Sequence, residues 1–149
     1  MDNPLGLQTA QPRFSWSLAS ERRGIVQRAY RIQVWSERES VWDSGVVESG
    51  QSTLVSYEGP ILLERRSYEY SICVRIQDGT WTDWSPRSSF EMGLLRPESW
   101  TAEWIGPSRE EEGPQPVTML RKSFKLPAKA KRARVYATSL GLYELRMNG

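Results

Sequence analysis

Carboxylates are the residues of this chain that could carry acid–base chemistry, because its 149 residues include no histidine and one cysteine. Hydrolysis of a glycosidic bond, for example, commonly uses one carboxylic acid and one carboxylate. The candidates are Asp43, Asp78, Asp83 and the run Glu110-Glu111-Glu112. The three aspartates stand beside turn glycines or between tryptophans, so turn capping or surface hydrogen bonding accounts for them. The glutamate run lies in a loop rich in Gly and Pro, where burial does not raise a pKa. The sequence therefore predicts no catalytic residue.

Other catalytic and cofactor chemistries are excluded by composition. Without histidine there is no Ser-His-Asp or Cys-His nucleophile, and a single cysteine cannot form a thiolate cluster for zinc. The eleven glycines are scattered at turns and form no phosphate-binding loop. We therefore expect no cofactor and no metal. Cys73 lies in a run with strand character and is interpreted as a small packed residue.

Three tryptophans remain as candidates for binding, since exposed aromatic rings stack on the apolar faces of sugars. Trp35 is out of phase with its apolar neighbours and is expected to face solvent or another domain. Trp81 and Trp84 flank a turn, and Arg75 is placed to stack on one of them as a cation–π pair. These residues form either a sugar-stacking platform or a structural ladder or interdomain contact. We favour the second interpretation, because sugar stacking needs a preorganised flat site.

The elements that position these side chains are predicted to be β-strands, because apolar residues alternate with period two and no helical stripe appears. In the clearest strand, 68–76, every second residue is apolar and able to point inward. The predicted strands begin at Phe14, Tyr30, Val41, Thr53, Tyr68 and Ser88. Turn signals such as Ser44-Gly45 and Gly59-Pro60 separate them. Short, regularly spaced strands of this kind predict an immunoglobulin-like or fibronectin type III-like sandwich over residues 1–95.

Residues 96–149 are expected to begin a second β-domain that is incomplete. Strands are predicted at 118–124, 132–138 and 142–147. Three strands are too few to close a sandwich, so a bare sheet edge is expected, and with it either fraying or pairing of two copies.

Charge and hydropathy give little indication of a partner. The net charge is +2, although eight basic residues from Arg121 onward face one acid, Glu144. Stacking aromatics are not interleaved with these charges as single-strand binders require, so no nucleic acid is expected. No apolar run approaches the roughly 20 residues that cross a bilayer, and the first residues are not a secretory signal. A soluble protein is expected, and its compartment is left open.

A series of short motifs, in order, is similar to the amino-terminal region of bacterial α-L-rhamnosidases of glycoside hydrolase family 78. The motifs include Asn3-Pro4-Leu5-Gly6, Pro12-Arg13-Phe14-Ser15-Trp16, Gln27-Arg28-Ala29-Tyr30-Arg31-Ile32, Val41-Trp42-Asp43-Ser44-Gly45, Gly59-Pro60-Ile61-Leu62, Phe90-Glu91-Met92-Gly93-Leu94-Leu95 and Trp100-Thr101-Ala102-Glu103-Trp104-Ile105. The similarity extends over essentially the whole chain.

The resemblance implies a non-catalytic fragment. Residues 1–95 would be the fibronectin type III-like module and residues 96–149 the start of a carbohydrate-binding-like β-sandwich. Members of the family hydrolyse terminal α-L-rhamnosyl groups in a downstream (α/α)₆ barrel, so that barrel is the implied partner and rhamnosylated carbohydrate a possible ligand. None of the family's catalytic residues has a position in this chain.

Two alternatives belong to other classes of protein. A free-standing carbohydrate-binding module would need an exposed aromatic platform. A receptor-type fibronectin module is suggested by Trp81-Thr82-Asp83-Trp84-Ser85, which is similar to the Trp-Ser-x-Trp-Ser box of cytokine receptors. Such receptors carry paired cysteines, which this chain lacks.

Overall fold

The structure is a computed structural model that describes residues 3–107 and 117–148. It contains two compact units, residues 1–102 and residues 103–149, and all the strands lie in the first. These strands are β1 (Arg13–Phe14), β2 (Gln27–Ser36), β3 (Glu39–Asp43), β4 (Val55–Ser56), β5 (Ser67–Ile76) and β6 (Ser88–Glu91). A short 3₁₀ turn, η1, follows at Pro97–Ser99.

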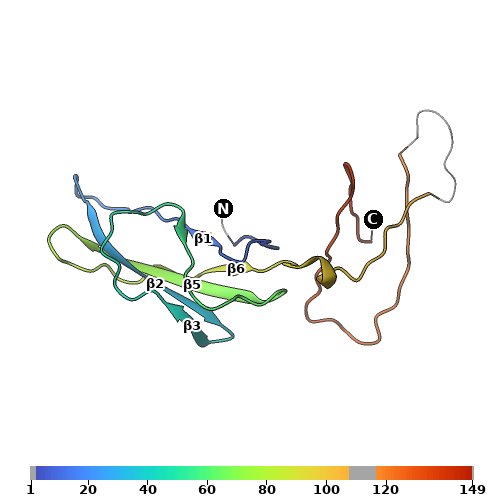
Figure 1. Ribbon diagram of the computed structural model, residues 1–149, viewed down its shortest axis with the longest axis horizontal. Coiled ribbons are helices and arrows are strands. Elements are labelled where there is room, and N and C mark those ends of the chain that lie inside the picture. Colours follow the sequence, from blue (N-terminus) through green and yellow to red (C-terminus); the bar gives the residue numbers. More distant parts are fainter. Residues whose placement is uncertain (1–2, 108–116, 149) are drawn as a thin grey trace. The chain divides into compact units, whose positions relative to one another are not determined.

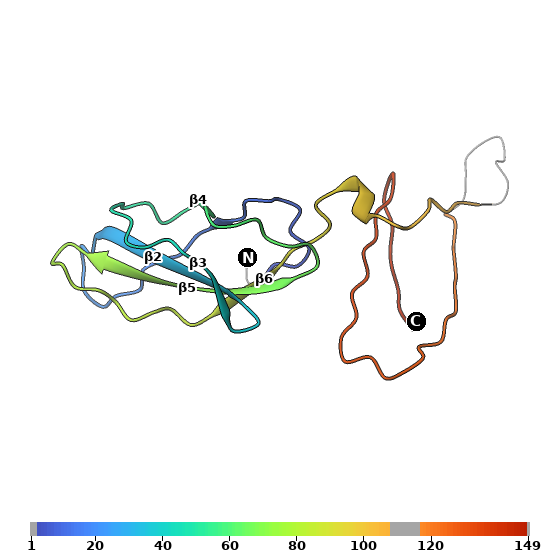
Figure 2. The same cartoon turned by 60° about the horizontal axis from the view of Figure 1, so that its bottom comes forward.

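The strands form two antiparallel sheets that face each other (Figures 1 and 2). One sheet has four strands in the order β3-β2-β5-β6, and the other is the short pair β1-β4. The long central strands β2 and β5 pair along most of their length, with Ile32 opposite Ile72 and Val34 opposite Tyr70. Their period-two alternation explains this pairing, because it turns one apolar face of each strand toward the second sheet.

Aromatic rings fill the space between the sheets. Phe14 on β1 lies at the centre, with its ring centroid 4.8 Å from that of Tyr70 and 6.1 to 6.5 Å from those of three other rings. Those three rings belong to Trp42, Tyr57 and Phe90. Rings in this range, inclined or offset, attract one another beyond simple burial. Because the single cysteine, Cys73, is free, the stability of the first unit depends on packing of this kind and not on a disulfide.

One polar side chain, Gln27, is buried and links three segments. Its Nε2 donates hydrogen bonds to the carbonyl oxygens of Ser49 and Gln51, at 3.0 and 2.8 Å, and its Oε1 accepts one from Trp16 Nε1 at 2.9 Å. Because the whole amide is satisfied, its burial carries no penalty of unpaired polar atoms. Gln27 thereby fixes the loop that leads from β3 toward β4.

The segment that leaves the sandwich is held by Glu64. Its Oε1 accepts hydrogen bonds from the backbone N–H groups of Leu95 and Arg96, at 2.7 and 2.9 Å. Its Oε2 accepts one from the Ser99 hydroxyl at 2.5 Å. The hydrogen bond from Ser99 is the largest of the effects that lower the pKa of Glu64. The carboxylate therefore fixes the chain direction at the start of η1.

Residues 117–148 contain no strand, so the strands predicted at 118–124, 132–138 and 142–147 are wrong for this structure. The physical reason is that a strand is defined by a hydrogen-bonded neighbour, and alternation supplies only the side-chain pattern. Apolar side chains such as Val117 and Leu142 are fully exposed there. That this region begins a second β-sandwich stays a prediction, as do the domain limits 1–95 and 96–149.

The predicted fold class is confirmed for the first unit. Strand content dominates, and the inward residues of β2 (Tyr30, Ile32, Val34) are buried as predicted. The first predicted strand is shorter than expected, because β1 ends at Phe14 and Leu18 is exposed. A helix long and apolar enough to cross a membrane does not occur among the described residues.

Candidate functional site

The candidate site is the outer face of the four-stranded sheet, where three arginines each lie over a tryptophan ring. The guanidinium carbons lie 4.4 to 5.9 Å from the ring centroids in the pairs Arg87 with Trp35, Arg75 with Trp81 and Arg31 with Trp84. We call these six residues the arginine–tryptophan ladder. A cation within about 6 Å of a ring centroid is attracted by the ring's quadrupole. The three tryptophans singled out in the sequence therefore share one arrangement.

The central arginine, Arg31, is oriented by Asp43. Its Nε and Nη2 donate to the two carboxylate oxygens, at 2.8 and 2.5 Å. The same carboxylate accepts hydrogen bonds from Gln33 Nε2 at 2.8 Å and from the backbone N–H of Gly45 at 2.9 Å. The hydrogen bonds from Arg31, with smaller contributions from Gln33 and Gly45, hold the pKa of Asp43 well below its usual range. A two-pronged pair of this kind fixes the guanidinium plane as well as its charge.

The two flanking arginines have acidic partners too. Arg87 Nη1 donates to Glu69 Oε2 at 2.8 Å, and Arg75 forms an ion pair with Glu48. In both pairs the carboxylate is more exposed than that of Asp43, so solvent screens them. Each arginine of the ladder therefore lies between a carboxylate and a ring, and its charge is already balanced.

The segment 82–85 is fastened to β5 and so positions two of the rings. The backbone N–H groups of Thr82 and Ser85 donate to the carbonyl oxygens of Val74 and Ile72, at 2.9 and 2.8 Å. The hydroxyls of Thr82 and Ser85 accept hydrogen bonds from the N–H groups of the same two residues, both at 3.1 Å. The hydroxyl groups replace the missing strand partner along this part of β5. Trp81 and Trp84 are held beside them on the outer face.

The described carboxyl groups whose pKa values are displaced are not suited to donating a proton. Asp43, Glu64 and Asp78 each have a lowered pKa, chiefly because of hydrogen bonds donated by Arg31, Ser99 and Thr80 respectively. A glycosidase acid needs the opposite, a raised pKa. The run Glu110-Glu111-Glu112 lies outside the described residues. Within the described part of the chain, no group of His, Cys, Asp or Glu side chains is arranged to hold a metal ion.

Cys73 lies on β5, opposite Arg31 on β2, and is buried. Burial is the main reason that the pKa of its thiol is raised. A thiol with a raised pKa holds little thiolate at neutral pH and is a poor nucleophile. The interpretation of Cys73 as a packed residue is confirmed.

Asp43→Asn is expected to lower stability at neutral pH and to reduce its loss in acid. The folded-state pKa of Asp43 lies below the unfolded value of about 3.9. Its contribution is therefore complete above about pH 4 and is lost as the pH falls toward the folded value. Urea denaturation at several pH values between neutral and acid checks this. Equal acid sensitivity of the variant and the parent chain would contradict it. Part of the acid sensitivity should persist, because Glu64 and Asp78 also have lowered pKa values.

Sequence reasoning found part of this arrangement. The turn caps are confirmed, since the backbone N–H of Gly45 donates to Asp43 and that of Thr80 donates to Asp78 at 3.0 Å. Arg75 lies over Trp81 as predicted. Reasoning from the sequence missed Arg31 and Arg87. Each of them lies over a tryptophan ring that comes from a distant segment of the chain. The shared phase of Arg31 and Trp35 on β2 places both on the outer face, and that was the available signal.

The two packed sheets and the arginine–tryptophan ladder together define an immunoglobulin-like β-sandwich module. The outer face of its four-stranded sheet is built from ionic and cation–π contacts. Residues 1–96 match the family model described as Rha78A-like, N-terminal immunoglobulin domain. The chain belongs to this family.

Relatives and solved structures agree with this assignment. The alpha-L-rhamnosidase of Formosa agariphila is 37% identical over 164 residues, which cover 99% of this chain and 17% of that protein. The alpha-L-rhamnosidase of Streptomyces avermitilis is 41% identical over 123 residues, 79% of this chain and 11% of that protein. The crystal structure of the Streptomyces avermitilis enzyme complexed with L-rhamnose superposes with a TM-score of 0.68 at 42% identity, over 71% of this chain and 11% of that one. The structure of the alpha-L-rhamnosidase from Dictyoglumus thermophilum superposes with a TM-score of 0.67 at 32% identity, over 70% of this chain and 12% of that one.

The chain therefore spans 11 to 17% of the length of these two relatives and corresponds to a small N-terminal portion of them. The resemblance drawn from the sequence motifs is confirmed.

Proposed function

We propose that this chain is a non-catalytic accessory module of a bacterial α-L-rhamnosidase, a longer protein that hydrolyses terminal α-L-rhamnosyl groups. The observation that supports this most directly is the match to a small part of proteins named alpha-L-rhamnosidase. The site agrees with it, because the described carboxyl groups with displaced pKa values are displaced in the direction that opposes acid catalysis.

The role proposed for the module is architectural. The three arginines of the ladder are already paired with carboxylates and rings, and such an arrangement stiffens a sheet face rather than leaving charges for a substrate. We infer that residues 1–95 are a fibronectin type III-like module and that residues 96–149 begin a carbohydrate-binding-like β-sandwich. The partner of both would be the (α/α)₆ barrel of the same longer protein. Dimerisation of the chain through a bare sheet edge stays a prediction.

An activity assay tests the proposal. The chain alone is expected to release no p-nitrophenol from p-nitrophenyl α-L-rhamnopyranoside, whereas the longer protein that contains it is expected to do so. Turnover by the chain itself would overturn the non-catalytic assignment. An inactive longer protein, tested on several rhamnosides, would overturn the assignment of the whole.

Carbohydrate binding by the ladder is the second candidate, since Trp81 and Trp84 are 37% and 40% exposed. The arginine over each ring argues against it, because the guanidinium already occupies the position a sugar would stack on. In a ¹⁵N NMR titration with L-rhamnose, the indole N–H signals of Trp35, Trp81 and Trp84 are therefore expected to stay in place. Movement of these signals, together with sharper movement in an Arg75→Ala variant, would favour a sugar platform.

A further inference from the structure

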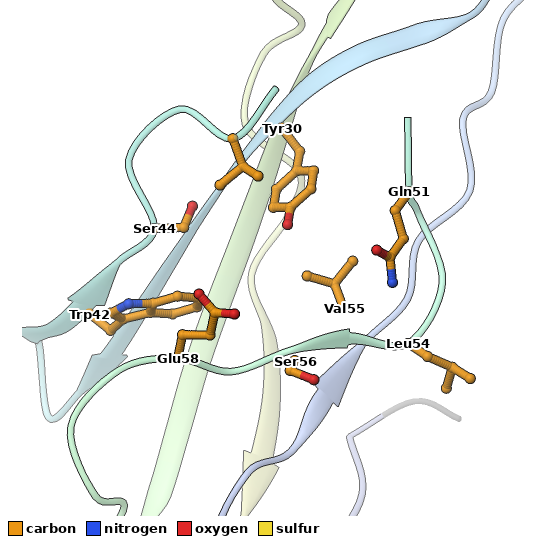
Figure 3. Close-up of a pocket in the computed structure, with 9 residues that line it drawn as sticks. Tyr30, Trp42, Ser44, Gln51, Leu54, Val55, Ser56 and Glu58 are labelled. Carbon is orange, nitrogen blue, oxygen red and sulfur yellow. The ribbon is translucent and has the colours of Figure 1, made fainter. Parts of the chain in front are cut away.

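A hollow of about 280 Å³ opens on the other side of the four-stranded sheet, between that sheet and β4 (Figure 3). Its walls include Tyr30 on β2, Trp42 on β3 and Val55 on β4. Gln51, from the loop that connects β3 with β4, and Glu58, which follows β4, complete the polar part. The hollow is separate from the arginine–tryptophan ladder, since Tyr30, an inward residue of β2, lines it, whereas Arg31 and Trp35 of the ladder belong to the outward set of β2.

The wall formed by the connecting loop is held in place by backbone hydrogen bonds. Val47 and Tyr30 exchange two of them, at 2.9 and 3.0 Å. The carbonyl oxygens of Ser49 and Gln51 accept from the buried Gln27. The carbonyl oxygen of Ser52 accepts from the backbone of Trp16 at 2.9 Å. The hollow is therefore preformed, and a ligand would not have to order this loop.

Two polar groups of the hollow lack partners. Within residues 3–107 and 117–148, neither the Tyr30 hydroxyl nor the Glu58 carboxylate makes a hydrogen bond or ion pair. In Figure 3 the Tyr30 hydroxyl points into the hollow, and Glu58 is among the residues that line it. Tyr30 is only 8% exposed, so its hydroxyl reaches solvent through this opening. Burial, and then the charge of Glu58, raise the pKa of Tyr30. The phenol therefore stays protonated and can donate a hydrogen bond.

The chemistry of these groups selects the ligand. The Glu58 charge disfavours anions. An ammonium or guanidinium group could pair with Glu58 but brings only donors, so it would leave the Tyr30 hydroxyl proton without an acceptor. A neutral polyhydroxylated ring fits better. A carboxylate can accept from two adjacent hydroxyls, a phenol can donate to a third, and the valine side chain can contact C–H groups.

We propose that this hollow is a binding subsite for a single neutral pyranose, with Glu58 accepting from sugar hydroxyls and Tyr30 donating to one. The volume is near the lower end of ligand pockets, about 300 Å³, which suits one sugar ring rather than an oligosaccharide. Hydrogen bonds to the Glu58 carboxylate and the Tyr30 hydroxyl carry the affinity. A dissociation constant on the order of millimolar is expected.

The test is a ¹⁵N NMR titration of the whole chain with L-rhamnose and, in parallel, D-glucose. Only the choice of L-rhamnose rests on the proposed function. Shifts are expected at Val47, Val55 and Glu58 and not at the indoles of the ladder. Glu58→Gln, at an exposed position, is expected to weaken binding about 10-fold, the value of one charged hydrogen bond. Tyr30→Phe should weaken it about as much, with the spread of its spectrum showing that it folds. Glu21→Gln, which removes an exposed carboxylate that does not line the hollow, is the matched control and should bind as the parent does.

Three outcomes would overturn the proposal. The first is a spectrum that neither sugar moves, and the second is a set of shifts that Glu58→Gln leaves unchanged. The third is binding of n-butylammonium at these residues without binding of either sugar, which would make the hollow a site for a cationic side chain. Each is distinct from failure of the proposed function, which is decided by hydrolysis of a rhamnoside in the longer protein.

Discussion

Phe14→Ala is expected to lower the free energy of unfolding by about 3–5 kcal/mol, the range measured for buried Phe-to-Ala changes. The side chain is 3% exposed and its ring contacts four other rings, those of Trp42, Tyr57, Tyr70 and Phe90. Removing it opens a cavity between the two sheets at the point where β1 meets β4. The pair β1-β4 is only two residues long on each side, so its backbone bonds cannot compensate for the lost packing. Urea denaturation followed by tryptophan fluorescence measures the difference.

Ile61→Ala is the control for this prediction. Ile61 is equally apolar but 85% exposed, so its truncation is expected to change stability by no more than about 0.5 kcal/mol. Similar losses for the two variants would show that the aromatic cluster does not hold the sheets together. A folded Phe14→Ala variant with unchanged stability would show that neighbouring rings close the cavity completely.

The two long strands were the most predictable part of the fold. Alternation along β2 and β5 places one residue in two on the core side, and burial follows this pattern at Tyr30, Ile32 and Val34. Adjacent residues differ in the same way at Leu54, which is exposed, and Val55, which is buried. Alternation is a local property, so a single sequence carries it in full.

Contacts between distant segments were less predictable. The rings of Trp84 and Trp35 meet Arg31 and Arg87 only because β5, β6 and the segment between them fold back onto β2. No local pattern encodes which cation covers which ring. The same limit explains the hollow, where Tyr30 and Glu58 are brought together by the loop that Gln27 anchors.

The strands predicted within residues 117–148 are wrong for the converse reason. Their alternation is a valid local signal, but a strand also requires a paired neighbouring strand, and residues 117–148 contain no strand. Exposed apolar side chains along this stretch, such as Met119 and Leu140, show the pattern without the sheet that would use it.

Gly59→Ala is expected to lower the free energy of unfolding by about 1–3 kcal/mol, the usual cost of forcing an extra methyl group into a packed core. A Cβ at this position would lie 2.5 Å from the Tyr57 hydroxyl oxygen and 2.6 Å from Cγ of Trp42. Neither ring can move aside without losing contacts of its own. Tyr57 is buried and donates its hydroxyl to the carbonyl oxygen of Pro60 at 2.9 Å, while Trp42 packs against both Tyr57 and Phe14.

The matched control for this substitution is Gly50→Ala, in the same unit. Its Cβ would lie 3.4 Å from the carbonyl oxygen of Gln27, an ordinary contact, so a change within about 0.5 kcal/mol is expected. Urea denaturation gives both values, and the indole signal of Trp42 should move in the Gly59 variant alone. Because Trp42 also lines the hollow, the Gly59 variant should bind a pyranose more weakly than the Gly50 variant if the hollow is the sugar subsite. Equal stability of the two variants would mean that Tyr57 can rotate away and that the glycine is not required for close packing.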